Sequence, residues 1–233
     1  METINYLIQE IKKRFISCKK MYYSNIEEKD KFDYQILGNI YFYESSVEPD
    51  YEKALNMYLK CVEFGLQDSQ TFFNVGYIYY SGNHGVDINY NEAYEWFKKS
   101  LFLGNKESLY YLATLYLHGF GCERNINKAI SIFRMSGEID NCVLSQHDLG
   151  MIYEHGFEDE NKIYIQPNLK EAMKWHKLAA NNGCLKSTNQ LANLIFENEN
   201  IEETCYLNDE INDKEIDNEF KDFDHIEIEG DDI

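Results

Sequence analysis

The chain of 233 residues carries a formal charge of −19, with 41 acidic and 22 basic residues. Its longest basic run is Lys12-Lys13-Arg14, and so short a run argues against a nucleic-acid-binding surface. No apolar stretch approaches the roughly 20 residues that span a bilayer, and no apolar run of signal length follows Met1. We therefore expect an intracellular, cytoplasmic protein without membrane insertion.

The two ends of the chain differ from its middle. Residues 3–23 place apolar side chains at helical spacing, which predicts that segment 1–31 is an extra helix capping the structure that follows. Residues 197–233 hold 16 acidic and two basic residues, which leaves only −5 of the charge to the rest of the chain. This composition predicts an acidic tail that is disordered or marginally helical.

Residues 32–196 repeat one pattern. A large residue followed by a small one recurs every 37 to 42 residues, at Leu37-Gly38, Val75-Gly76, Leu112-Ala113, Leu149-Gly150 and Leu191-Ala192. A second series begins with alanine and has a large residue three positions later, at Ala54, Ala93, Ala129 and Ala172. A period of this length predicts an array of small units, about four repeats and a final helix, instead of one globular core.

Each unit predicts two helices, because its apolar residues recur at spacings of three and four. Gly82, Gly119 and Gly156 stand where the first helix should end in a left-handed residue. N-cap residues precede the second helix at Asp50, Asn89, Asn125 and Asn168. Glu92 and Glu171 have the spacing of capping-box partners. Asp140 replaces the glycine that closes the other units, and we expect it to be left-handed.

The small residues of both series predict close crossings between the two helices of a unit. A glycine inside a helix costs about 0.5–1 kcal/mol relative to alanine, so its recurrence indicates that close packing compensates. Gly150→Leu is therefore expected to overpack the crossing.

The repeated string resembles the Sel-1-like repeat, a relative of the tetratricopeptide repeat. It reads Leu-Gly-x-x-Tyr-x-x-Gly, then Asn or Asp, then Ala-x-x-Trp-aromatic, with Ala179, Ala180 and Gly183 closing the last copy. The resemblance covers about residues 32–196. It implies an all-α fold: a right-handed α-solenoid, or superhelix, of antiparallel helix pairs whose concave face holds other proteins.

The sequence shows no catalytic, cofactor-binding or metal motif. His118 and Cys122 are four residues apart, but zinc needs about four convergent ligands and no second pair is visible. His147, Glu154 and His155 fall along one predicted helix and suggest an acid–base cluster, but we interpret them as a solvated helix face, since no nucleophile is apparent. We expect no enzyme activity and no cofactor.

A second stripe on the first helices is the candidate partner-binding surface. With about 100° per residue, positions −3, +1 and +4 from each repeat Gly or Ala fall on one face, apart from the packing stripe. By analogy with tetratricopeptide arrays, this stripe lines the concave face and offers aromatic anchors. The predicted partner-contacting residues are Phe73, Tyr77, Tyr80, Tyr110, Thr114, His147, Met151 and Glu154.

The sequence thus predicts a scaffold or adaptor that binds a protein or peptide segment on its concave face. One alternative is a hydrolase built on the same repeats, an activity that the resemblance associates with some secreted relatives. We disfavour that alternative, because this sequence shows neither the regularly spaced cysteine pairs nor the secretion signal of those relatives. Another is a regulatory subunit whose acidic tail controls the groove. The oligomeric state is left open.

Overall fold

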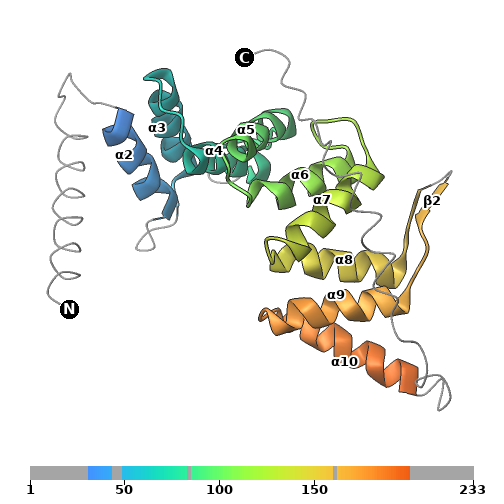
Figure 1. The fold of residues 1–233 in the computed structure, drawn as a ribbon. Helices are drawn as coiled ribbons and strands as arrows, with labels where there is room; N and C mark the ends of the chain where they lie inside the picture. Colours follow the sequence, from blue (N-terminus) through green and yellow to red (C-terminus); the bar gives the residue numbers. More distant parts are fainter. Residues whose placement is uncertain (1–30, 44–48, 83–84, 160–161, 200–233) are drawn as a thin grey trace, which may run out of the picture. The chain divides into compact units, whose positions relative to one another are not determined.

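The computed structural model describes residues 31–43, 49–82, 85–159 and 162–199. These residues form nine helices and one short antiparallel hairpin (Figure 1). The helices are α2 Lys31–Tyr43, α3 Tyr51–Glu63, α4 Ser69–Ser81, α5 Tyr90–Phe102, α6 Ser108–His118, α7 Ile126–Glu138, α8 Val143–His155, α9 Leu169–Asn181 and α10 Leu185–Glu199. The strands are β1 Phe157–Asp159 and β2 Lys162–Ile165.

The helices pair in the order that the repeats predict. The most extensive packing joins α2 to α3, α4 to α5, α6 to α7 and α8 to α9, and smaller contacts join each pair to the next. Each pair is one repeat unit, so the all-helical repeat architecture is confirmed. Residues 1–30 and 200–233 lie outside the described residues, and with them the predicted capping helix and nearly all of the predicted acidic tail. The first compact unit ends at Leu191 and the second begins at Ala192, within α10.

The four predicted N-caps are confirmed. The side chains of Asp50, Asn89, Asn125 and Asn168 each accept a hydrogen bond from the backbone N–H three residues later, at 2.9 to 3.2 Å. The N–H of each cap donates in turn to the carbonyl of the repeat tyrosine in the preceding helix. These bonds are Asp50–Tyr41, Asn89–Tyr79, Asn125–Tyr116 and Asn168–Tyr153, at 2.7 to 2.9 Å.

The predicted capping boxes are wrong. Glu92 accepts a hydrogen bond from Trp96 Nε1 at 3.0 Å, and Glu171 accepts one from Trp175 Nε1 at 3.2 Å. The cap N–H that a capping-box glutamate would take is already bonded to the repeat tyrosine, so the glutamate satisfies the buried indole instead.

The predicted glycine turns are confirmed, with one local difference. Gly82 and Gly119 end α4 and α6 in left-handed conformation, with φ of 56° and 71°. Gly156 has φ 73° but ψ 179°, so the chain continues as the hairpin β1–β2 instead of a short turn. Phe157 pairs with Ile165 across this hairpin. The hairpin fills the longer connection of the fourth unit and is a departure from purely helical structure.

The prediction for Asp140 is wrong by one residue. Asn141 is the non-glycine residue with positive φ, at 51°, among the residues the structure describes. Helix α7 continues to Glu138, and Ile139 still has φ −87° and ψ −44°, which moves the turn one position along the chain. Asparagine tolerates this conformation better than most side chains.

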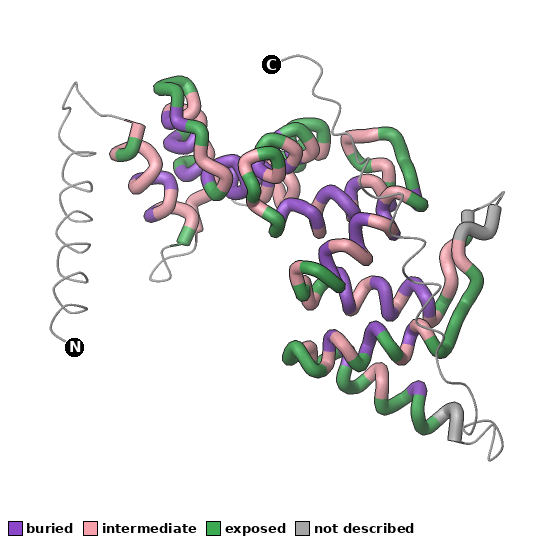
Figure 2. Tube along the Cα trace, viewed as in Figure 1, coloured by how far each residue is buried: buried purple, intermediate pink, exposed green. Residues whose placement is uncertain are grey.

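The small repeat residues lie against aromatic rings of the partner helix. A Cβ added to Gly38 would lie 2.5 Å from the Tyr58 ring, and one on Gly76 would lie 2.9 Å from Phe97. The ring residues Tyr58 and Phe97 are fully buried. The crossings are therefore as close as predicted, and an aromatic ring fills each of them. Buried residues accordingly follow the facing sides of the helix pairs (Figure 2).

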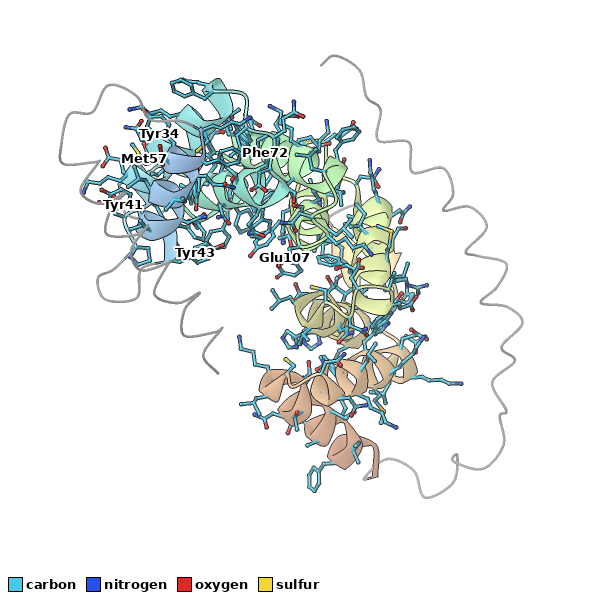
Figure 3. All side chains as sticks on the ribbon, turned by 60° about the vertical axis from the view of Figure 1, so that its left-hand side comes forward. Tyr34, Tyr41, Tyr43, Met57, Phe72 and Glu107 are labelled. Atoms are coloured by element: carbon cyan, nitrogen blue, oxygen red, sulfur yellow. The ribbon has the colours of Figure 1, made fainter. Side chains whose placement is uncertain are left out.

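Further apolar clusters complete the first two units. Tyr34, Tyr41 and Met57 lie in the cluster between α2 and α3 (Figure 3). Phe72 on α4 contacts Trp96 on α5 edge to face, with ring centroids 5.3 Å apart. Both tryptophans, Trp96 and Trp175, are buried and belong to the core.

Candidate partner-binding face

The predicted binding residues lie on α4, α6 and α8, the first helices of three consecutive units. Phe73 is buried, with 8% of its surface exposed. Tyr77, Tyr80, Tyr110, Thr114, His147, Met151 and Glu154 are all partly exposed. The set therefore presents a half-buried surface, and Phe73 supports it from beneath.

Aromatic rings on this face join neighbouring units. We call Phe42, Phe73, Tyr77, Tyr80, Tyr110 and Tyr111 the aromatic cluster. Tyr77 meets Phe42 of the preceding unit at 5.9 Å and Tyr111 of the following unit at 5.8 Å, both edge to face. Such ring pairs contribute about 0.5–1.5 kcal/mol beyond the area they bury. The cluster is thus a contact between repeats as well as a surface.

Tyr111 is the central residue that sequence reasoning missed. Its ring contacts Phe73 at 5.5 Å, Tyr80 at 5.3 Å and Tyr110 at 5.2 Å. Tyr111 occupies position −2 of its repeat, which lies near +160° on the helical wheel, outside both predicted stripes. The same position in the neighbouring units holds Asn74 and Asp148, whose hydrogen bonds to other helices appear only in the structure.

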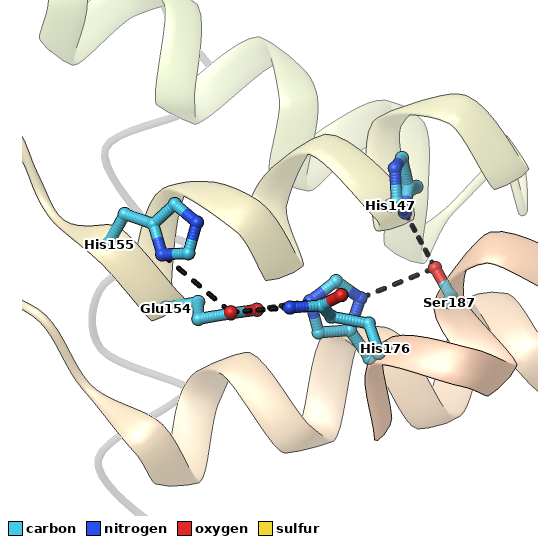
Figure 4. Close-up of polar contacts among 6 residues, drawn as sticks. His147, Glu154, His155, His176 and Ser187 are labelled. Atoms are coloured by element: carbon cyan, nitrogen blue, oxygen red, sulfur yellow. Dashed lines mark hydrogen bonds and ion pairs between the residues drawn. The ribbon is translucent and has the colours of Figure 1, made fainter. Parts of the chain in front are cut away.

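A polar cluster takes the place of the rings at α8. Ser187 Oγ lies 2.8 Å from His147 Nδ1 and 3.3 Å from His176 Nδ1 (Figure 4). His176 Nε2 lies 3.2 Å from Glu154 Oε2, and Gln190 donates to Glu154 Oε1. His176 is the aromatic-position residue of its repeat, and its ring lies against Gly150.

One arrangement of hydrogens satisfies every bond of the polar cluster. With both imidazoles neutral, His147 donates to Ser187, Ser187 donates to His176 Nδ1, and His176 Nε2 donates to Glu154. His176 and Ser187 are fully buried. Burial lowers the pKa of His176, although the Glu154 carboxylate acts in the opposite direction.

The prediction of a solvated face at His147, Glu154 and His155 is wrong for two of the three residues. His155 is exposed, whereas His147 and Glu154 are partly buried and bonded to neighbouring helices. The partners, His176 and Ser187, come from distant parts of the sequence, so helical spacing within α8 could not reveal them. A serine, a histidine and a carboxylate in this order also occur in hydrolases. Here Ser187 has no exposed surface, so its hydroxyl is not presented to a substrate.

Metal-binding geometry is not found in the part of the chain that the structure describes. Within those residues, no three or more His, Cys, Asp or Glu side chains converge as a metal site would require. His118 instead stacks on Phe120 at 5.2 Å. Among the described helices, none is long and apolar enough to cross a membrane.

Helix pairs stacked in sequence order, with aromatic and polar side chains joining the first helices, define an α-solenoid of short repeats. The Sel1 repeat model matches four segments, residues 36–60, 73–105, 106–141 and 143–184, which make up more than half of the chain. The chain belongs to the Sel1 repeat family. Proteins of this family and fold generally mediate protein–protein interactions and are typically non-catalytic scaffolds.

Solved structures and a curated relative resemble the chain. A Sel1 repeat protein from Oxalobacter formigenes is 25% identical, with a TM-score of 0.57 over 77% of this chain and 68% of that one. A protective antigen of uropathogenic Escherichia coli is 22% identical, with a TM-score of 0.48 over 73% of this chain and 42% of that one. An F-box protein of Arabidopsis thaliana is 30% identical over 54% of this chain, which spans only 32% of that relative's length.

Proposed function

We propose that the protein is a non-enzymatic scaffold that binds a peptide or protein segment on the face formed by α4, α6 and α8. The observation that carries this proposal is the row of partly exposed side chains on three consecutive first helices: Tyr77, Tyr80, Tyr110, Thr114, His147, Met151 and Glu154. Tyrosines combine a large apolar body with a hydroxyl, which suits them to anchor a partner. Their contacts with one another hold the rings in place before binding.

Contacts between the rings also determine which substitutions can test the face. Replacing Tyr77 or Tyr110 by alanine would remove packing between units together with any partner contact. Thr114 is a better site, because it is partly exposed and, among the described residues, its hydroxyl bonds only the carbonyl of Tyr110 in its own helix, at 3.0 Å. Thr114→Arg places a long side chain over the face and leaves the ring contacts intact.

Ser131 provides a matched control on the other helix of the same unit. Its hydroxyl makes the same kind of bond, to the Asn127 carbonyl at 2.9 Å, and it is also partly exposed. Peptides selected from a displayed random library against the natural chain are then measured for binding to Thr114→Arg and Ser131→Arg. We expect Thr114→Arg to weaken binding at least about tenfold, the loss of roughly 1.4 kcal/mol, while Ser131→Arg leaves it unchanged. Equal binding to both variants, or no enriched peptide, would contradict the proposal.

A further inference from the structure

Asp148 is a carboxylate whose hydrogen-bonding capacity is largely unused. It lies on α8 at the repeat position that Tyr111 occupies on α6, and it is partly exposed. The Tyr110 hydroxyl donates a hydrogen bond to Asp148 Oδ2 at 3.1 Å. Among the residues the structure describes, it is the one hydrogen-bond donor to this carboxylate. Since an ionised carboxylate accepts about four hydrogen bonds, the described residues leave most of that capacity unused.

The residues around Asp148 favour a positive charge. Tyr110 donates a hydrogen bond to the carboxylate, and Tyr80 lies near it, since the pKa of Tyr80 is raised by burial and further by Tyr90 and Asp148. Two phenol rings therefore adjoin the carboxylate. The faces of such rings attract cations. Burial raises the pKa of Asp148, which means that the ionised carboxylate has lost part of its hydration without a compensating charge in contact.

The basic groups nearest Asp148 do not pair with it. His118, His147 and Lys186 are close enough to act on its pKa, yet no ion pair joins any of them to Asp148 within the described residues. Asp140, between α7 and α8, differs from Asp148 in having a partner, because Lys106 Nζ lies 2.5 Å from Asp140 Oδ1. An incoming cation can therefore satisfy Asp148, whereas Asp140 is already paired.

We propose that Asp148 binds the guanidinium group of an arginine in the partner segment, with Tyr80 and Tyr110 flanking it. A guanidinium is planar and always charged, so it can donate to a carboxylate through two N–H groups and stack on an aromatic ring. The inference rests on the proposed function, since it assigns one anchor of the segment bound on α4, α6 and α8.

The test uses N-acetyl-arginine amide as the probe and follows the backbone amide resonances of the full chain by NMR. N-acetyl-citrulline amide has the same shape without the charge, and N-acetyl-lysine amide has the charge without the planar group. We expect arginine to shift resonances of α6 and α8 and to bind at least about tenfold more tightly than citrulline, as for a charge-assisted bond. Equal binding of citrulline, tighter binding of lysine, or no shift in α6 and α8 would overturn the inference.

Asp148→Asn and Asp140→Asn remove the same charge at two positions. Asparagine at 148 still accepts the bond from Tyr110, so the packing is retained, and thermal unfolding followed by circular dichroism checks this. We expect arginine binding to be lost in Asp148→Asn and kept in Asp140→Asn, whereas equal loss would indicate non-specific attraction to an acidic chain and overturn the assignment. If Thr114→Arg abolishes peptide binding and Asp148→Asn has no effect, the arginine anchor is wrong and the binding face stands.

Discussion

Gly150 and His176 face each other across the α8–α9 pair so closely that a Cβ on the glycine would lie 2.5 Å from His176 Cε1. The same contact joins Gly38 to Tyr58 and Gly76 to Phe97. In these three units the glycine thus leaves room for the ring on the opposite helix. The partner of Gly150 is a histidine, so at this crossing the core of the solenoid contains a titratable group.

Gly150→Ala is expected to lower the free energy of unfolding by about 1–3 kcal/mol, the usual cost of overpacking. His176 cannot move aside easily, because Glu154 and Ser187 hold both ring nitrogens. Gly137→Ala is the comparison, since its Cβ would lie 3.2 Å from Trp175 and 3.3 Å from Gln146, a milder contact than at Gly150, and alanine favours the helix, so its loss of stability should be smaller. Urea unfolding measures the free energy of unfolding of both variants. Equal stability of the natural chain and Gly150→Ala would contradict the close contact, and Gly150→Leu should be more severe.

Tyr111→Ala is expected to destabilise the chain by about 2–4 kcal/mol, because it removes the ring that joins α4 to α6. Tyr111→Phe keeps the ring and should stay within about 0.5 kcal/mol of the natural chain, since no hydrogen bond joins the Tyr111 hydroxyl to the described residues. Thermal unfolding compares the stability of each variant with that of the natural chain. A large loss in Tyr111→Phe would show that the hydroxyl, and not the ring, carries the contact.

Asn125→Ala is expected to cost about 1 kcal/mol by removing the N-cap of α7. Its side chain accepts the Lys128 N–H at 2.9 Å, a bond that alanine cannot replace. Asn127→Ala, two residues along in the same helix and exposed, provides the control. Urea midpoints distinguish the two, and equal midpoints would mean that water satisfies the free N–H as well as the cap does.

Acidification is expected to destabilise the fourth unit through His176. Its pKa is lowered in the folded chain, so below pH 6.5 the unfolded chain binds the proton more readily than the folded one. This contribution to stability is complete above pH 6.5 and is lost as the pH falls toward the folded-state pKa. The raised pKa of Asp148 has the opposite sign, because protonation relieves a buried charge as the pH falls through that value.

A substitution isolates the contribution of His176 to the pH dependence. His176→Gln should flatten the decline in the urea midpoint between pH 7 and about pH 5. An identical decline in the natural chain and His176→Gln would assign the pH dependence to other groups.

Local signals predicted most of the fold. Asn89 and Asn125 cap helices because the cap bond spans three residues, and Gly82 ends a helix because no other residue takes its conformation so cheaply. Glu92 shows the limit of such reasoning. Its side chain accepts a hydrogen bond from Trp96 because the N–H of the cap residue donates to the Tyr79 carbonyl, in another helix.

The candidate site was harder to predict, because its contacts join residues far apart in the chain. Helical spacing placed Tyr77 and Tyr110 on one face but gave no indication of Tyr111 between them. Likewise, His147 and His176 become neighbours only when α8 packs against α9, and Ser187 from α10 then bonds both. Periodicity describes single helices, whereas these clusters depend on the distance between helices.

The bond from each cap N–H to the tyrosine carbonyl has a consequence for the loops. Since Asn168 is tied to Tyr153 just as Asn125 is tied to Tyr116, the chain between the two anchors does not set the geometry of the pair. The fourth unit uses that freedom to carry β1 and β2. The same junction in the other units should accept foreign segments, such as an epitope or a small inserted domain, at the C-terminal ends of the first helices.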